Sequence, residues 1–318
     1  MTEKVYFSIQ TCTYNRADTL VRTYASLTSQ TLKDFEWIVY DNGSTDGTRA
    51  LVERWQKEAD FPIVILGRED NAAVQLSWNI GIGVAKGEFW TLLDSDDACV
   101  PTALEVFKAK WEAIPDDQKN EFVGVACTAV NQHGDLVGNS FPTDPFDTNA
   151  LDLTYKYKVK GEKWGVMRVD VLREFPFSTE NHHQLPGVIW RAIATQYRTR
   201  YFNEPLRIYY VNEEDRTDQL SFHLDISAVG VGKRDSALDL LNNYLPWLLR
   251  SPLELCRTVY VYTQMSIALG YRFSEQIGAI NPFFAKILYV VARPFYGLWR
   301  LVPQPVESRV RVLLGYDK

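Results

Sequence analysis

Three carboxylates lie within four consecutive residues, Asp94-Ser95-Asp96-Asp97, directly after the hydrophobic run Phe89–Leu93. Carboxylates this close together repel one another unless a cation gathers them. Hard oxygen ligands of this kind suit magnesium or manganese, and such a metal would also contact a diphosphate. The cluster therefore indicates a metal site, and the alternative is a solvated acidic turn that caps the next helix.

Two further polar segments follow expected strands. Thr13-Tyr14-Asn15-Arg16 comes after the first strand, and Asp41 comes directly after Trp37–Tyr40. In open α/β sheets, ligands bind beyond the carboxyl ends of the strands, so these loops and the acidic cluster are expected to converge on one crevice. An aromatic ring, carboxylates and a metal would suit a nucleotide diphosphate. The alternatives are a packing role for Tyr14 and a turn or N-cap role for Asp41.

Over the first hundred residues, short apolar runs alternate with amphipathic helical patterns. This alternation predicts an α/β layered domain with parallel strands, and its elements would position the residues above. The strands expected there are Val5–Thr11, Phe35–Tyr40, Pro62–Leu66 and Phe89–Leu93, with a helix at Val74–Ala85. A second half begins near Glu121, with strands at Phe122–Val130, Glu162–Arg168 and Arg200–Tyr210 and a helix at Val188–Tyr197. From Leu224 the chain reads as helices interrupted by prolines.

Several motifs resemble those of family 2 glycosyltransferases. The run TCTYNR is similar to the opening PTYNR of that family, with Cys12 in place of proline, and DNGSTDGT is similar to its second signature. The stretch NAAVQLSWNIGIGVAKGEFWTLLDSDD resembles the family's lead-in to its DxD motif, in which an Asn, an Asn-x-Gly and an Ala-x-Gly-Glu precede the acidic residues. These elements keep the family's order and spacing over roughly residues 5–98. The resemblance implies a GT-A fold, a Rossmann-like mixed sheet flanked by helices, here with a C-terminal helical extension.

The resemblance also implies roles for individual residues. A nucleotide-sugar donor, UDP-sugar by default, would be bound by residues of the three loops and the intervening signature: Thr13, Tyr14, Arg16, Asp41, Asn71, Asn79, Asp94 and Ser95. Asp96 would ligate Mn or Mg with help from Asp97. For Asn71 and Asn79, capping the helix between them is the open alternative.

The catalytic base of this family lies between the last two expected strands. Many relatives carry a Glu-Asp pair there, whereas this chain has Glu180 as the only carboxylate between Phe177 and Arg191. By the resemblance, Glu180 is the first candidate for the base, and His182 and His183 are the alternatives.

The resemblance and the pattern divide the chain into three parts. Residues 1–98 would form the nucleotide-sugar-binding half and residues 99–223 the acceptor-binding half of one catalytic domain, and residues 224–318 a helical extension. Within 281–303, Lys286, Arg293 and Arg300 recur every seventh residue in an apolar, aromatic segment. Cations at that spacing share one helix face, which favours a helix lying in a membrane interface over one that spans it. Packing against the catalytic domain is the alternative.

Charge and cysteine content narrow the class of protein. The formal net charge is −6, and the segment from Asn281 onward carries +4 of its own, which leaves an acidic body. An acidic body argues against a nucleic-acid partner, and a basic aromatic tail favours peripheral contact with a membrane surface. The four cysteines form no CxxC pair, and the N-terminus has no signal-peptide pattern, so a cytoplasmic location is expected. Within the cytoplasm, the basic tail favours the inner face of the plasma membrane.

The sequence therefore predicts a metal-dependent, inverting glycosyltransferase that moves a sugar onto a hydroxyl of a saccharide or lipid-linked acceptor, in polysaccharide or glycolipid synthesis. Inversion is implied by the resemblance alone. Two alternatives are a catalytically weakened protein that binds nucleotide sugars, and a nucleotidyltransferase. The latter class usually carries a glycine-rich, basic phosphate loop near the N-terminus, and TCTYNRAD contains neither glycine nor a basic cluster.

Overall fold

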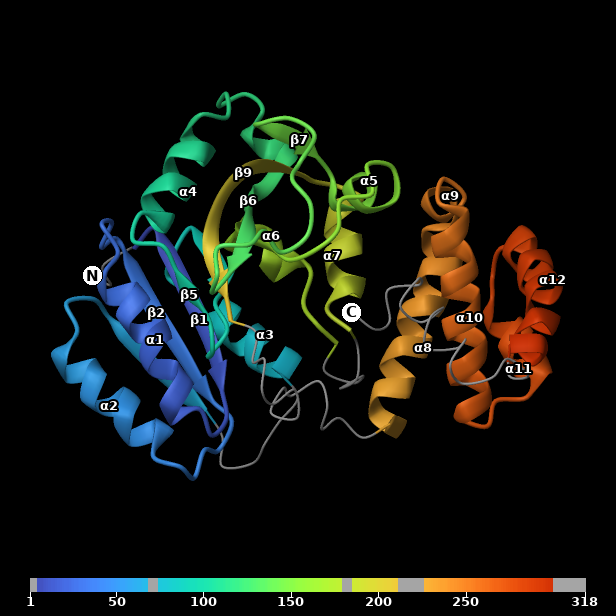
Figure 1. The fold of residues 1–318 in the computed structure, drawn as a ribbon, viewed down its shortest axis with the longest axis horizontal. Coiled ribbons are helices and arrows are strands. Elements are labelled where there is room, and N and C mark those ends of the chain that lie inside the picture. The colour runs from blue at the N-terminus through green and yellow to red at the C-terminus, as the bar shows by residue number, and fades with distance from the viewer. Residues whose placement is uncertain (1–4, 68–73, 179–184, 211–225, 300–318) are drawn as a thin grey trace. The chain divides into compact units, whose positions relative to one another are not determined.

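The computed structural model describes residues 5–67, 74–178, 185–210 and 226–299. The chain divides into two compact units (Figure 1). Unit 1 contains residues 1–182 and 189–216, and unit 2 contains residues 183–188 and 217–318. The candidate residues Asn71 and Glu180, and the alternative bases His182 and His183, lie outside the described residues.

Unit 1 is built on a mixed sheet with the strand order β3-β2-β1-β4-β8-β6-β9-β5, and β7 pairs with β9. The strands are β1 (Phe7–Thr13), β2 (Phe35–Asp41), β3 (Ile63–Gly67), β4 (Phe89–Leu92), β5 (Ala98–Cys99), β6 (Phe122–Asn131), β7 (Phe146–Thr148), β8 (Lys163–Arg168) and β9 (Arg198–Tyr209). The first four run parallel to their neighbours, and β8 then joins β4 and β6 in antiparallel pairing. The carboxyl ends of β1, β2 and β4 therefore lie at one edge of the sheet.

Helices cover both faces of this sheet. They are α1 (Ala17–Thr28), α2 (Thr48–Glu58), α3 (Val74–Val84), α4 (Ala103–Glu112), α5 (Ala150–Tyr155), α6 (Val169–Glu174) and α7 (Gly187–Ala194), with a short 3-10 turn at Lys119–Glu121. On one face, α1, α2 and α4 bury Leu20, Trp55 and Phe107 against the strands. On the other face, α3 and α7 bury Trp78 and Ile193. Because both faces of the central strands are covered, β1 and β2 are buried along almost their whole length, including the polar Ser8, Gln10 and Glu36.

The strands expected from the sequence are confirmed, with small shifts at their ends. The shift that matters is at the site: β1 and β2 continue to Thr13 and Asp41, which pair in register, so these two residues end strands and do not lie in loops. The short strands β5 and β7 were not expected. Two or three residues are too few for a periodic pattern, and these strands exist because each pairs with β9.

Unit 2 is helical throughout its described part. It consists of α8 (Ile226–Asn243), α9 (Leu245–Leu248), α10 (Pro252–Ala268), α11 (Phe273–Ala279) and α12 (Phe283–Trp299), coloured orange to red in Figure 1. Tyr262 and Tyr289 form its centre, with ring centroids 5.5 Å apart in an edge-on arrangement. Within the described residues, every helix is too short or too polar to cross a membrane.

Gly67 ends β3 beside the residue that ends β2. Its φ of +150° lies in the region that favours glycine, and a Cβ at this position would lie 2.2 Å from the backbone oxygen of Asp41. The absence of a side chain therefore lets β3 approach the end of β2 closely.

We expect Gly67→Ala to lower the free energy of unfolding by at least about 1–3 kcal/mol, because the added methyl forces both a strained φ and a backbone displacement. Gly83→Ala is the matched control, since a Cβ at Gly83 in α3 meets nothing within 4 Å. That change should be neutral or stabilising by about 0.5–1 kcal/mol. Urea denaturation measures both, and equal stability of the two variants would contradict the close approach.

Candidate active site

The loops after β1 and β2 are bound to each other. The Asn15 backbone N–H donates to Ser44 Oγ at 2.9 Å, and the Thr45 N–H donates to Asn15 Oδ1 at 2.7 Å. Asn15 has a φ of +51°, which asparagine tolerates better than most residues, and this turns its side chain toward the second loop. Asp41 fixes that loop from inside, because its Oδ1 accepts bonds from the backbone N–H and the hydroxyl of Ser44.

Asp46 joins the starts of the two helices that follow these loops. It accepts hydrogen bonds from the Ala17 N–H at the start of α1 and from the N–H and hydroxyl of Thr48 at the start of α2. Partial burial raises the pKa of Asp46, but these hydrogen bonds outweigh it and hold the pKa below its usual range. A carboxylate at two helix N-termini is also favoured by both helix dipoles. The roles of Asn15 and Asp46 do not follow from the motifs alone, although turn-forming residue types at these positions are a sequence signal for them.

Two polar atoms near the strand ends are buried without a hydrogen-bond partner in the described part of the chain. They are the hydroxyl of Thr13, whose residue is 2% exposed, and Oδ1 of Asn42, whose residue is 3% exposed. Buried polar groups nearly always have a hydrogen-bond partner, so a buried polar atom without one requires an explanation. A ligand that supplies a donor or acceptor at this edge of the sheet would satisfy them.

The acidic cluster after β4 is gathered by a cation from the protein itself. Arg207 of β9 is buried, and its guanidinium donates to Asp94 Oδ2 at 2.5 Å and, through Nε, to Asp97 Oδ2 at 2.7 Å. The other oxygen of Asp97 accepts the backbone N–H of Tyr210 at 2.9 Å. The paired carboxylates raise the pKa of Arg207 further above its usual range, although burial opposes this. Burial raises the pKa of Asp97 to about 6, and Arg207 limits the rise, so Asp97 is ionised at neutral pH.

These contacts separate the roles of the three aspartates. Asp97 is 1% exposed and both of its oxygens are taken by protein donors, which favours a structural role over the predicted metal ligation. Asp96 is half-buried, and within the described residues its carboxylate has no hydrogen bond beyond its own backbone N–H. Burial and then the nearby Asp94 raise the pKa of Asp96, so an added cation would relieve both. Asp96 is therefore the carboxylate of the cluster that best fits a divalent metal.

The remaining predicted residues fall into two groups. Tyr14 and Arg16 are half-buried beside the strand ends, Arg16 close enough to Asp96 to lower its pKa, and Ser95 is buried within the acidic turn. Asn79 is different. Its amide donates to the Phe177 carbonyl at 2.8 Å and accepts the Phe177 N–H at 2.9 Å, which favours a structural link between α3 and the segment after α6 over contact with a donor.

Cys12, the residue that stands in place of the family's proline, is accommodated by neighbouring polar groups. Its sulfur lies 3.3 Å from the Ser77 hydroxyl and 3.6 Å from Gln10 Nε2, which donates to it. Burial raises the pKa of the Cys12 thiol to about 12, so the thiol stays protonated at neutral pH. Thiolate chemistry is therefore disfavoured at this position.

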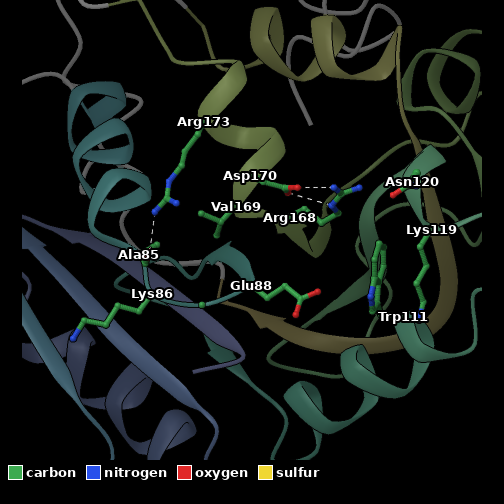
Figure 2. A pocket seen from close by; sticks show the side chains of 11 residues that line it. Ala85, Lys86, Glu88, Trp111, Lys119, Asn120, Arg168, Val169, Asp170 and Arg173 are labelled. Atoms are coloured by element: carbon green, nitrogen blue, oxygen red, sulfur yellow. Dashed lines mark hydrogen bonds and ion pairs between the residues drawn. The ribbon is translucent and has the colours of Figure 1, made fainter. Parts of the chain in front are cut away.

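Figure 2 shows a polar cavity of 540 Å³ at the opposite end of β4, where Lys86–Glu88 precede the strand. The two arginines that line it already bind other groups of the protein. Arg168 pairs with Asp170, and Arg173 donates to carbonyl oxygens at the end of α3, including Ala85 O at 2.9 Å. This cavity lies at the amino end of the strand, whereas ligands of open α/β sheets bind beyond the carboxyl ends. It is therefore distinct from the cluster around Asp96.

We expect Arg207→Met to lower the free energy of unfolding by about 3–5 kcal/mol, because it leaves the buried Asp97 without its counter-ion. Arg207→Lys, which keeps the charge but loses the planar fork, should fold and yet weaken nucleotide binding, since one ammonium cannot bridge both carboxylates in the same geometry. Urea denaturation and calorimetry with UDP provide the two measurements.

Arg200→Met is the matched control, because Arg200 lies on the same strand and pairs with Asp147 alone, at 2.7 Å. It should leave nucleotide affinity unchanged. If Arg207→Met were as stable as the unaltered protein, the guanidinium would not be what holds the cluster together.

The family model described as glycosyl transferase family 2 matches residues 8–174. A GalNAc(5)-diNAcBac-PP-undecaprenol beta-1,3-glucosyltransferase from Campylobacter jejuni is 34% identical over 207 residues, which cover 64% of this chain and 64% of that protein. The chain spans less than two thirds of the length of the first curated relatives that it matches.

Two solved structures have a similar fold. S. aureus TarS 1-349 in complex with UDP-GlcNAc has a TM-score of 0.62 at 18% identity, covering 92% of this chain and 88% of that one. The mannosyltransferase PcManGT from Pyrobaculum calidifontis, in complex with GDP-Man and Mn2+, has a TM-score of 0.52 at 16% identity, covering 99% of this chain and 85% of that one. At these identities the likeness concerns the fold, and it confirms the expected GT-A class, a mixed sheet flanked by helices.

Proposed function

The chain belongs to glycosyl transferase family 2, and from that premise we propose that it transfers a sugar from a nucleotide-diphosphate sugar to a hydroxyl acceptor, with inversion and with a divalent metal. The observation that carries the proposal is the convergence of β1, β2 and β4 at one edge of the sheet. There, Asp96 has a carboxylate that is free of other protein donors in the described residues, and Thr13 and Asn42 have unsatisfied polar atoms.

The donor set around Asp96 fits magnesium or manganese. Magnesium is commonly held by one or two carboxylates together with substrate phosphates and water, not by a cage of protein ligands. Among the described residues, no group of three or more His, Cys, Asp or Glu side chains lies close enough together to hold a metal ion. Asp96 would hold the metal, with Asp94 beside it. The metal, when bound, would neutralise charge on the diphosphate leaving group.

The strand-end residues support binding of a nucleoside. Both hydrogen bonds of Asp41 use Oδ1, and Oδ2 is the oxygen we assign to an N–H of the base. Tyr14 would contribute an aromatic face and Arg16 a positive charge near the phosphates. We propose UDP as the nucleotide. TarS, the structure with the higher TM-score of the two, holds UDP-GlcNAc, whereas PcManGT holds GDP-Man.

A single displacement needs one base on the acceptor hydroxyl and no protein nucleophile. Arg207 keeps Asp94 and Asp97 fixed, so the donor side of the site is preorganised before the acceptor arrives. We propose Glu180 as the base. Its position lies outside the described residues, and the support for it is its place in the sequence between β8 and α7.

The acceptor we propose is a saccharide or a lipid-linked saccharide, in synthesis of a surface polysaccharide or glycolipid at the cytoplasmic side of a membrane. The support is the name of the Campylobacter jejuni relative, which describes an undecaprenol-linked acceptor for that protein.

We expect Asp96→Asn to weaken manganese-dependent binding of UDP at least about tenfold, because a neutral amide replaces a charged ligand of the cation. Calorimetry with UDP, in manganese and again in chelator, measures the metal-dependent part. Asp116→Asn is the control, since it removes an exposed carboxylate that is not part of the acidic cluster and pairs with Lys119. Equal affinity of Asp96→Asn and the unaltered protein would remove Asp96 from the metal site.

We expect Glu180→Gln to lower the rate of sugar transfer by about 10²–10⁴-fold while UDP affinity is unchanged, because only the general base is lost. His182→Asn and His183→Asn serve as comparisons at the two alternative positions. A Glu180→Gln variant with full transfer activity would assign the base elsewhere. A chain that binds UDP-sugar and shows no transfer with any of several acceptors would instead support the weakened donor-binding alternative.

A further inference from the structure

The outward face of α12 is apolar along its described length. Phe283, Phe284, Ile287, Val290 and Val291 are between 43% and 78% exposed, and they recur at the three- and four-residue spacing that places side chains on one face of a helix. The exposed Pro294 continues this face by one more step. An exposed, contiguous apolar face of this kind usually marks a binding surface.

The opposite face of α12 is fixed within unit 2, so the helix cannot turn its apolar side inward without losing its packing. Ala285 and Tyr289 are fully buried, and the Tyr289 hydroxyl donates to the side-chain oxygen of Gln276 on α11. The Tyr289 ring also lies edge-on to Tyr262 of α10. The start of the helix is tied down by the Asn281 N–H, which donates to Asn242 of α8 at 2.8 Å.

One cation borders the apolar face: Lys286 is half-buried and lies beside it on the helix surface. Arg293 lies one heptad further along, but its guanidinium is directed into unit 2, 4.6 Å from the centre of the Phe273 ring, and its Nε is buried. The sequence from Gln276 to Val306 contains no acidic residue, whereas it contains Lys286, Arg293 and Arg300.

These features match the surface of an anionic bilayer better than they match another protein. The rim of a protein–protein interface usually carries mixed polar groups on every side of the apolar centre. On α12, one side of the apolar face carries a cation, and the sequence from Gln276 to Val306 contains no acidic residue. The described helix is 17 residues long and is interrupted by charge, so it does not meet the requirement for a span. A helix with a broad apolar face and a cation beside it is suited to lie in the plane of the membrane–water interface. There its apolar face would enter the boundary between headgroups and acyl chains, and the cation would bind lipid phosphate.

We infer that α12 is a membrane-docking surface that inserts Phe283, Phe284, Ile287, Val290 and Val291 into the headgroup region of an anionic lipid bilayer. The inference rests on unit 2 alone and holds whether or not unit 1 transfers sugar. If both hold, the bilayer that binds α12 would also be the source of a lipid-linked acceptor.

The test is flotation of the full chain with vesicles of phosphatidylcholine plus phosphatidylglycerol, and with vesicles of phosphatidylcholine alone. We expect the unaltered chain to float with the anionic vesicles, less so with the neutral ones, and less as salt is raised, because exposed charges are screened. The double variant Ile287→Asp/Val291→Asp should bind the anionic vesicles at least about tenfold more weakly. Val291→Trp should act in the opposite direction and raise the affinity.

Leu253→Asp is the matched control, because Leu253 is 54% exposed on α10 of the same unit and is not on α12. It should bind vesicles as the unaltered chain does, and the thermal unfolding of all variants checks that they fold. The inference is overturned if the unaltered chain does not float with anionic vesicles, or if the double variant floats equally well. It is also overturned if the chain binds no vesicles and forms a dimer that the double variant dissociates, since the face would then be an interface between copies.

Discussion

The ion pairs of Arg207 with Asp94 and Asp97 are the contact on which the candidate site depends. Three carboxylates crowded at one strand end would repel one another and open the loop, and the guanidinium of Arg207 on β9 offsets that repulsion for Asp94 and Asp97. The same contact joins the last strand of the sheet to the loop after β4, next to the short pairing of β5 with β9. The pairing of β5 with β9 and the shape of the acidic turn therefore both depend on β9.

In this arrangement, aspartates with identical side chains have different surroundings and are suited to different roles. A buried carboxylate is tolerated when it is fully hydrogen-bonded and paired, as Asp97 is, and such a group has little capacity left for a ligand. Asp96 has the opposite surroundings: burial without a partner side chain bonded to it in the described residues, and a like charge nearby. Two identical, adjacent residues are thereby suited to different tasks: Asp97 holds the loop, and Asp96 can attract a cation.

The sequence predicted most of the fold because the unit 1 strands have strong local patterns, and it predicted the convergence of Asp41 and the acidic cluster because parallel strands end at a shared edge. It did not predict Arg207, whose partner Asp97 lies 110 residues away, since no local pattern reports such a contact. For the same reason Asn79 was taken for a donor-binding candidate, although its amide is bonded to Phe177, 98 residues away. Roles that depend on long-range partners are visible only once the chain is folded.

The bonds between the loops after β1 and β2 have an evolutionary consequence. The Asn15 N–H donates to the Ser44 hydroxyl, and the Asn15 side-chain oxygen accepts the Thr45 N–H. The Arg16 N–H donates to the Thr48 hydroxyl at 3.0 Å. Each of the two loops therefore depends on the other for some of its hydrogen bonds. Substitutions in contacting residues are rarely additive. The two motifs therefore form a single inherited module: a change in one constrains which changes the other tolerates. Recombination between relatives that exchanged one of these segments would have to exchange the other with it.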